Sequence, residues 1–535
     1  MSNFSNINTD NLFSGENKVE STSSNGSGDE VMGVANNDKS IIAKKQDNIN
    51  QENQQKEDIL SINEILKSMV RSIPDNIDLV SVLKKELNDS LQKYYTKTEG
   101  LKITKIPDDV YIVAMVYKLL KITKNKGWDM ARENDFIYLY NGKYWEECTK
   151  DDLYNFFKHI AKKMNFYHPS KAETHKFKED FYKQFLASAG FYKPNTNKDI
   201  VLLNCSNGTL EVTQNKVKLR QHNKKDFLKY VLHFDYDKTA KAPIFEKYLN
   251  DVLDADSQKV LQEFCGYVFV SNLKLEKCLV CYGSGANGKS VFFEIINSLL
   301  GRENIATKSL GDLTDNSQGS YNRAMIKDSL LNYGSEIKGK NIDVDIFKRL
   351  ISGEPVQARL PYARPFDLKN NTKFMFNANE LPKVDEHNEA VFRRFLIVPF
   401  DVTIPKDKRD SELHNKIVSN ELSGVLNWVL VGLERLLKNK EFTVSQKVED
   451  ALSQYKKESD SVALFVDESE YIPSMDNDDF KPTRSLYNEY KDLTKENGQY
   501  PLGKNKFSAR FKALGFNPHN NGDSRGYLVE KKILK

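Results

Sequence analysis

The chain has 535 residues, with 79 Lys or Arg against 75 Asp or Glu, so its net charge is only +4 at pH 7. At roughly 150 residues per domain this length predicts three or four folding units, and the balanced charge excludes a uniformly basic coat for nucleic acid. The apolar runs are far shorter than the ~18 residues of a membrane helix, no secretory signal is recognisable, and five scattered cysteines are too few for a disulfide framework. We expect a reduced, cytoplasmic protein that does not bind membranes.

Residues 1–60 are rich in Asn, Ser, Gly and Asp and contain only two aromatic residues. Such a segment buries too little apolar surface to offset its ordering entropy, so we expect it to be disordered. Apolar residues from Ile59 to Met69 recur at helical spacing, which predicts a first helix. A second amphipathic helix is predicted over 78–95.

The chain then alternates between helix-like and strand-like segments. The expected elements are helices over 108–120 and 150–165 and hairpins over 135–145 and 200–220. Each hairpin has an Asn-Gly pair at its turn, Asn141-Gly142 or Asn207-Gly208, and such pairs favour tight turns. We therefore assign residues 61–244 to an α+β domain.

A glycine-rich loop follows a short apolar strand in the sequence KCLVCYGSGANGKS, residues 277–290, and an apolar helical segment follows the loop. Strand, glycine loop and helix form the context that a P-loop requires. Glycines let the loop amides point inward, and a helix N-terminus adds partial positive charge, so this loop is predicted to hold the phosphates of ATP. Lys289 is expected to reach the β- and γ-phosphates, and Ser290 to help hold Mg²⁺. The predicted nucleotide-binding residues are Gly283, Ser284, Gly285, Ala286, Asn287, Gly288, Lys289 and Ser290.

Two cysteines in the strand before this loop, Cys278 and Cys281, have the CxxC spacing of some zinc and redox sites. The sequence has no second pair of this kind to complete a zinc site. We therefore interpret both as core cysteines.

Hydrolysis of a nucleotide also needs an acidic group, a polar sensor of the γ-phosphate and a cation. An apolar strand within 329–337 leads to Glu336, and another over 373–378 leads to Asn379. Ligands bind at the carboxyl ends of strands in α/β sheets, so both are candidate catalytic residues, and Glu336 is also a candidate metal ligand. Arg393 and Arg394 precede a third strand; taken alone, such a pair is more often a salt-bridged surface feature.

Residues 356–369 predict a hairpin with Tyr362, Ala363 and Arg364 at its tip. A basic, aromatic tip suits contact with a nucleic-acid backbone. An ordinary surface hairpin is an equally good interpretation of the same residues.

The C-terminal part divides by charge. Residues 441–481 form a predicted acidic linker, in which 448–480 hold ten acidic residues against two lysines. The last 54 residues have eleven Lys or Arg against five Asp or Glu. Two helices and a β-hairpin are predicted over 482–535, the order of a winged-helix DNA-binding domain; a helix pair that docks a partner protein is the alternative. The expected DNA contacts are Lys504, Lys506, Arg510, Lys512 and Arg525.

The order of these motifs resembles superfamily 3 helicases. The segments GSGANGKS, KRLISGEPVQAR, FNANELP and FRRFLIVPF, with the strand end Ser335-Glu336, are similar to replication helicases of phages, plasmids, pathogenicity islands and poxviruses, the phage/plasmid primase-helicase family. The specific motifs cover residues 245–440, and weaker similarity extends upstream and into 482–535. Within the family the chain resembles a replication initiator of a staphylococcal pathogenicity island.

The resemblance implies an AAA+-like P-loop motor over 245–440, an N-terminal collar, and a homo-hexameric ring that binds ATP and Mg²⁺ between subunits. The matching positions are Lys289 and Ser290 for Walker A, Glu336 for the Walker B carboxylate, Asn379 for the sensor and one of Arg393 and Arg394 for the arginine finger. Many Walker B motifs have two adjacent acids, whereas Ser335 precedes the single acid here. This departure leaves the role of that acid open.

The resemblance also implies movement along one DNA strand from 3′ to 5′. The segment between Lys348 and Arg364 matches the pore element that tracks the strand. The DNA contacts expected in it are Lys348, Arg359, Tyr362 and Arg364.

The implied function is an ATP-dependent DNA helicase and replication initiator of a mobile genetic element in a bacterial host. Its expected partners are single- and double-stranded DNA, including a replication origin, and host or element replication proteins. An ATP-gated origin-binding initiator without robust unwinding and a primase-helicase are the alternatives. Asp235 and Asp237 resemble the paired metal carboxylates of a polymerase, but no further acids accompany them, so a turn after a strand is the favoured interpretation.

Overall fold

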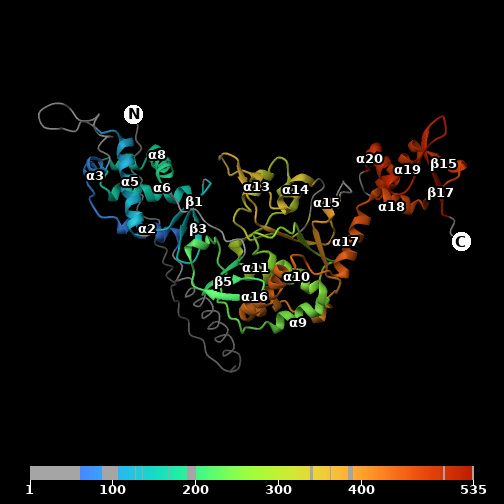
Figure 1. The fold of residues 1–535 in the computed structure, drawn as a ribbon, viewed down its shortest axis with the longest axis horizontal. Coiled ribbons are helices and arrows are strands. Elements are labelled where there is room, and N and C mark those ends of the chain that lie inside the picture. Colours follow the sequence, from blue (N-terminus) through green and yellow to red (C-terminus); the bar gives the residue numbers. More distant parts are fainter. Residues whose placement is uncertain are drawn as a thin grey trace, which may run out of the picture. The chain divides into compact units, whose positions relative to one another are not determined.

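The computed structural model describes most of the chain from residue 61 onwards. The described residues are 61–86, 106–126, 128–134, 136–166, 168–189, 200–335, 337, 342–361, 363–382, 389–497 and 501–532 (Figure 1). Residues 1–60, expected to be disordered, lie outside this set, as does the part of the second predicted helix beyond Glu86. None of the helices in the described ranges combines the length and apolar character that crossing a bilayer requires.

The N-terminal part is mainly helical. Its helices are α2 (Ile62–Ser72), α3 (Leu79–Glu86), α5 (Asp108–Lys126), α6 (Lys150–Lys163), α7 (Pro169–Ala172) and α8 (His175–Ser188). Two of them begin at a capping box, formed by Ser61 with Glu64 at α2 and by Thr149 with Asp152 at α6. Their apolar faces meet in one core that includes Phe157. The helices predicted from apolar spacing are therefore confirmed where the structure describes them.

Two small antiparallel sheets accompany these helices. The strands are β1 (Met130–Glu133), β2 (Phe136–Tyr140) and β3 (Trp145–Cys148) in one sheet and β4 (Val201–Cys205), β5 (Gly208–Val212) and β6 (Val217–Arg220) in the other. The turn between β2 and β3 is built on Asn141, whose Oδ1 accepts hydrogen bonds from the backbone N–H groups of Lys143 and Tyr144 at 3.1 and 2.9 Å. Both predicted hairpins are confirmed, and each gains a third strand.

A five-stranded parallel sheet follows. Its strands are β7 (Cys278–Tyr282), β8 (Ile305–Ala306), β9 (Leu331–Gly334), β12 (Lys373–Ala378) and β13 (Phe395–Pro399), in the order β13-β7-β12-β9-β8. Both faces are covered, because Cys281 and Met375 belong to one core and Val280 and Phe376 to another. Strands buried on both faces have nearly continuous apolar sequences, which is why the sequence predicts this mixed α/β architecture.

Helices connect and cover these strands. They are α11 (Lys289–Leu300), α12 (Leu310–Thr314), α13 (Gly319–Ala324), α14 (Val344–Ile351) and α15 (Glu389–Phe392), with the hairpin β10 (Val356–Ala358) and β11 (Phe366–Leu368) after α14. Three more, α9 (Pro243–Val252), α10 (Ala255–Tyr267) and α16 (Leu413–Asn439), share one core with α11 (Figure 1). A Cβ at Gly432 of α16 would lie 2.4 Å from the carbonyl of Gln262, so only glycine allows α10 and α16 to approach this closely. Short 3-10 helices are η2 (Lys224–Asp226), η3 (Arg302–Asn304), η4 (Lys406–Lys408) and η5 (Asn477–Asp479).

The segment expected to be an acidic linker, residues 441–481, is folded. Its elements are α17 (Gln446–Glu458), α18 (Ser461–Glu468), β14 (Tyr471–Pro473) and the start of β15 (Phe480–Pro482). Tyr455 of α17 is buried beside the parallel sheet and donates a 2.6 Å hydrogen bond to the carbonyl of Pro382. Phe465 of α18 is buried in the C-terminal core.

The C-terminal unit therefore begins before residue 482. Its remaining elements are α19 (Thr483–Glu496), α20 (Lys504–Ala513), β16 (Pro518–Asn520) and β17 (Arg525–Lys531). Strand β17 pairs antiparallel with β14, β15 and β16, so the acidic segment supplies strands to this sheet.

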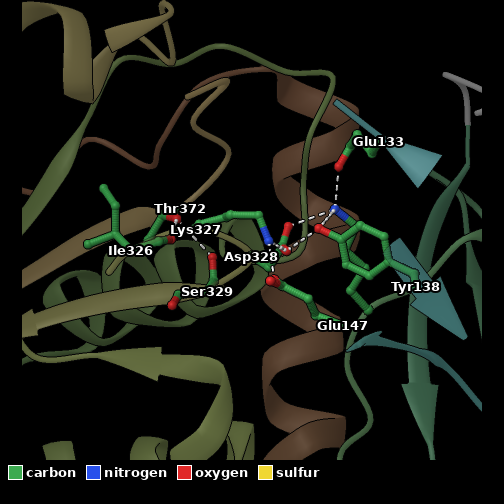
Figure 2. Close-up of polar contacts among 9 residues, drawn as sticks. Glu133, Tyr138, Glu147, Ile326, Lys327, Asp328, Ser329 and Thr372 are labelled. Carbon is green, nitrogen blue, oxygen red and sulfur yellow. Dashed lines mark hydrogen bonds and ion pairs between the residues drawn. The ribbon is translucent and has the colours of Figure 1, made fainter. Parts of the chain in front are cut away.

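A cluster of polar side chains connects the first small sheet to the parallel sheet (Figure 2). Asp328, in the turn before β9, accepts a 2.7 Å hydrogen bond from the hydroxyl of Tyr138 on β2. Its carboxylate also lies 2.7 Å from Lys229 Nζ and 2.6 Å from Lys327 Nζ. We call this cluster the polar joint; its members are Glu133, Tyr138, Glu147, Lys229, Lys327 and Asp328.

Candidate functional site

The glycine loop, residues 283–288, connects the C-terminal end of β7 to α11, at the edge where all five parallel strands end. Its final residue, Gly288, has φ +91°, in the left-handed region that favours glycine. Because β7 lies between β12 and β13, the segments that follow both neighbours flank the loop. The backbone N–H of Gly283 donates a 3.1 Å hydrogen bond to the carbonyl of Ala378, the last residue of β12.

Lys289 is buried under this loop at the start of α11. Its Nζ donates hydrogen bonds to the carbonyl of Gly283 at 2.6 Å and to Oδ1 of Asn287 at 3.1 Å. The amide of Asn287 in turn donates to the carbonyl of Phe400, after β13, at 2.9 Å. Burial lowers the pKa of the Lys289 amine. A buried amine that donates to oxygen acceptors of its own loop is suited to bind anionic oxygens in their place.

Two of the residues expected to complete the site, Asn379 and Ser290, lie at this edge of the sheet, whereas Arg393 and Arg394 precede β13 and lie at the opposite edge. Asn379 directly follows Ala378 and is exposed beside the glycine loop, and Ser290 is exposed in the first turn of α11. Glu336, the predicted acid, lies outside the described residues, although the strand leading to it, β9, is where the sequence placed it. Within the described ranges no group of three His, Cys, Asp or Glu side chains could hold a metal ion. Of the two predicted ligands for Mg²⁺, Ser290 and Glu336, the structure therefore describes the Ser290 hydroxyl.

The adjacent arginines have different environments. Arg394 is buried, and its guanidinium donates to Glu276 at 2.8 Å and to the hydroxyl of Ser352, at the end of α14, at 2.9 Å. Arg393 is 60% exposed, and its guanidinium lies 3.4 Å from Glu276. Arg393 can therefore reach a group outside this chain, whereas Arg394 binds the sheet to α14.

Sequence reasoning missed two buried polar residues near the loop. Asn377 of β12 donates to the hydroxyl of Tyr333 at 2.6 Å, and its Oδ1 has no hydrogen-bond partner among the described residues. The signal for it was a polar residue inside the apolar run KFMFNA. Tyr248 of α9 donates to the carbonyl of Gly288 at 2.8 Å. No local sequence signal points to this contact.

The hairpin expected to contact DNA is present as β10 and β11, but Tyr362 at its tip lies outside the described residues. Arg364 is exposed, and Lys348 lies 3.5 Å from Asp345 within α14. The guanidinium of Arg359 donates to the backbone at the tip and lies over a neighbouring tyrosine ring, so it is held at the base of the turn.

The basic residues of the C-terminal unit are brought together only in part. Lys504, Lys506 and Lys512 are exposed on α20, and Arg525 is exposed at the start of β17. Arg510 instead donates a 2.7 Å hydrogen bond to Asp460, a buried carboxylate at the start of α18. This arginine is engaged within the unit, and its contact with DNA stays a prediction.

Two other interpretations are tested by the structure. Asp237 accepts hydrogen bonds from the backbone and the hydroxyl of Thr239 at 2.8 and 2.7 Å, which lower its pKa, so it forms a turn as expected. Cys278 and Cys281 are free and fully buried, and burial raises the pKa of both thiols to about 12. They are core cysteines, as predicted.

Comparisons with known proteins identify similarity in three regions. Residues 281–394 match a family of unknown function (DUF5906), residues 116–254 match a family described as D5 N terminal like, and residues 457–531 match one described as Poxvirus D5 protein-like. The chain therefore resembles D5-like proteins on both sides of the glycine-loop region. No curated protein matches the chain.

Solved structures of the NrS-1 C-terminal region also resemble the chain. The apo structure has 12% sequence identity and a TM-score of 0.42, over 80% of this chain and 100% of that chain. An A form apo structure has 13% identity and a TM-score of 0.42, over 79% of this chain and 100% of that chain.

Proposed function

We propose that the chain is an ATP-dependent DNA helicase and replication initiator that moves 3′ to 5′ as a homo-hexameric ring. The observation that carries this proposal is the position of the buried Lys289 in a glycine loop at the centre of a parallel sheet's C-terminal edge. Asn379 follows β12, the neighbour of β7 on one side, at the same edge of the sheet as the loop, and the arginine pair precedes β13, the neighbour on the other side, at the opposite edge. The matches to D5-like families at both ends support the same assignment.

In this proposal the glycine loop is a P-loop, and bound ATP supplies the phosphoanhydride bond whose hydrolysis drives movement. Lys289 would exchange its contacts with Gly283 and Asn287 for phosphate oxygens, which neutralises their charge. The Ser290 hydroxyl and Glu336 would hold Mg²⁺. Asn379, exposed after β12, would orient the attacking water.

The two arginines are proposed to have different roles in ATP hydrolysis. A side chain that stabilises transition-state charge in the site of a neighbouring subunit must extend from the surface of its own subunit. Arg393 is the exposed member of the pair. Arg394 would fix the position of Arg393 relative to α14, because its guanidinium binds Glu276 and Ser352. We therefore assign Arg393 as the finger and Arg394 as a positioning residue.

DNA would be contacted at two places. Lys348 of α14 and the hairpin after it, with Arg359, Tyr362 and Arg364, would track a single strand in the ring. The C-terminal unit, with helices α18, α19 and α20 and the hairpin of β16 and β17, would act as a winged helix on duplex DNA at an origin. Its exposed Lys504, Lys506, Lys512 and Arg525 would supply phosphate contacts.

Strand separation on a forked duplex tests the motor. Wild type is expected to unwind from a 3′ single-stranded tail with ATP and not from a 5′ tail, and Lys289→Ala is expected to lose unwinding. Lys259→Ala, which removes an exposed lysine of α10, is the matched control and should retain it. Unwinding from the 5′ tail would contradict the direction, and unwinding by Lys289→Ala would contradict the assigned site.

The second candidate is an initiator that uses ATP only to assemble on its origin. Its sign would be ATP-dependent binding of origin DNA without unwinding of any fork, because such a switch still needs the loop but performs no work on the duplex. A primase-helicase is less well supported, because Asp237 is engaged in a turn. Primer synthesis that is lost in Asp237→Asn, with unwinding retained, would favour it.

A further inference from the structure

The hydroxyl of Tyr248 touches the last carbonyl of the glycine loop. Tyr248 lies on α9, is 3% exposed, and donates a 2.8 Å hydrogen bond to the carbonyl oxygen of Gly288. Burial raises the pKa of this phenol, so the hydroxyl keeps the proton that it donates. The ring also packs on the loop, since a Cβ at Gly288 would lie 3.0 Å from its Cε2.

The bonded carbonyl belongs to the peptide that joins Gly288 to Lys289. The same oxygen accepts the backbone N–H of Phe292 at 3.0 Å, the first hydrogen bond of α11. A trans peptide is planar, with its C=O and N–H groups pointing in opposite directions. Fixing this carbonyl towards α9 and α11 therefore points the backbone N–H of Lys289 out of the helix start, towards the interior of the loop. Backbone N–H groups in this position are the donors that bind phosphate at helix N-termini.

The helix that carries Tyr248 is itself fixed at its first turn. Glu421 of α16 is buried, and its two oxygens accept the backbone N–H groups of Ile244 and Phe245, each at 3.0 Å. A Cβ at Gly424 would lie 2.3 Å from the carbonyl of Lys241, so α16 and the start of α9 are in close backbone contact. The Tyr248 hydroxyl is thus held at a defined position relative to the core.

We propose that Tyr248 is a positioning residue of the phosphate site: its hydrogen bond to Gly288 sets the orientation of the peptide whose N–H, on Lys289, binds the phosphate chain of the nucleotide. This inference rests on the proposed function, since it requires that the glycine loop binds a nucleotide. It adds to the phosphate site a residue that lies 40 positions upstream of Gly288. Tyr248 does not touch the reacting atoms in this role.

The test is Tyr248→Phe, which removes the hydroxyl and keeps the ring. Tyr230→Phe is the matched control, because Tyr230 is also buried and donates to a backbone carbonyl, that of Leu202, at 2.9 Å, in the second small sheet. A fluorescent ADP analogue is displaced from each full-length protein by ADP, by ATPγS and by inorganic pyrophosphate. Thermal unfolding of the three proteins is measured in parallel without nucleotide.

Tyr248→Phe is expected to lower the affinity for ADP, for ATPγS and for pyrophosphate by the same factor, about three- to tenfold, which is the usual effect of one lost hydrogen bond. Tyr230→Phe should bind all three like wild type. A merely structural role would lower the unfolding temperature of both variants similarly and leave affinity unchanged.

Three outcomes would overturn the proposal. Unchanged affinity in Tyr248→Phe would remove the positioning role while leaving the proposed motor intact. Weaker ADP binding with unchanged pyrophosphate binding would place the effect on the nucleoside rather than on the phosphates. Failure of the wild-type protein to bind ADP, ATPγS or pyrophosphate would reject both the nucleotide site and this inference.

Discussion

The hydroxyl of Tyr138 donates a 2.7 Å hydrogen bond to the carboxylate of Asp328, 190 residues later in the chain. This contact is the centre of the polar joint, which attaches the first small sheet to the turn before β9 (Figure 2). The Asp328 side chain is 26% exposed and Lys229 is 16% exposed, so the ion pair between them is partly shielded from water. Shielded pairs of this kind cost more to break than exposed ones, because an unpaired charge is left behind.

We expect Asp328→Asn to lower the free energy of unfolding by about 1–3 kcal/mol, since Lys229 and Lys327 would each lose one carboxylate partner and keep the other, Glu133 or Glu147. The control is Asp251→Asn, which breaks the ion pair with Lys247 on the surface of α9, where both side chains are more than half exposed. That change should cost less than about 0.5 kcal/mol. Urea unfolding followed by intrinsic fluorescence measures both. Equal effects of the two substitutions would show that the polar joint does not stabilise the fold.

The stabilising effect of Asp328 should depend on pH in a defined direction. Burial alone would raise the pKa of its carboxyl, but Lys229 and Lys327 outweigh that effect and hold the pKa below its ordinary value. A carboxyl with a lowered folded-state pKa contributes its full stability above the unfolded-state pKa of about 3.9, and loses it as the pH falls through the folded-state value. The difference in stability between wild type and Asp328→Asn should therefore be constant from about pH 5 to pH 8 and shrink below about pH 4. Unfolding curves across this range test it; a difference that grows on acidification would reverse the assigned sign.

The glycine loop could be predicted because its determinants are contiguous. Lys289 is six residues from the carbonyl of Gly283 that it binds, so strand, loop and helix are all visible in one stretch of sequence. The Tyr248 contact comes from a helix 40 residues upstream, and only the packing of α9 on α11 creates it. In the sequence Tyr248 is one apolar position of an amphipathic helix, which predicts burial and not a partner.

The prediction of a linker over residues 441–481 rested on charge composition, and the structure shows helices and strands there. Ten acids against two lysines over 448–480 suggested a solvated connector. The apolar residues Val448, Leu452 and Tyr455 recur at helical spacing within this segment. Through them α17 packs against the two cores that cover the parallel sheet. Apolar periodicity was the better predictor here, because acidic side chains on the opposite face of a helix remain in water without affecting its burial.

The arginine pair gives a prediction that separates fold from catalysis. Arg393→Ala should leave the unfolding temperature within about 2 °C of wild type, because this side chain is exposed, and should reduce ATP hydrolysis by roughly 10³-fold, as the loss of an arginine finger does. Arg394→Ala should lower the unfolding temperature, because it leaves the hydroxyl of Ser352 without its guanidinium donor and removes the closer of the two arginine contacts of Glu276.

Mixing inactive subunits extends the test of the pair. Arg393→Ala subunits mixed with Lys289→Ala subunits should regain part of the hydrolysis that each lacks alone, because some interfaces then hold an intact loop facing an intact finger. Steady-state phosphate release measures this. If Arg394→Ala lost ATP hydrolysis at wild-type stability while Arg393→Ala stayed fully active, Arg394 would be the finger and Arg393 the positioning residue.

The C-terminal unit gives the last prediction, from two basic residues two positions apart on α20. Lys512 is exposed, so Lys512→Ala should weaken duplex binding similarly for all sequences and reduce the slope of log affinity against log salt by roughly one unit. Arg510 faces the buried carboxylate of Asp460, so Arg510→Ala should instead destabilise the unit by about 2–3 kcal/mol. Fluorescence anisotropy with labelled duplex between 50 and 200 mM salt, together with thermal unfolding, distinguishes these effects. A reduced salt slope in Arg510→Ala at unchanged stability would mean that Arg510 leaves Asp460 to bind phosphate, and would return it to the DNA-contacting surface.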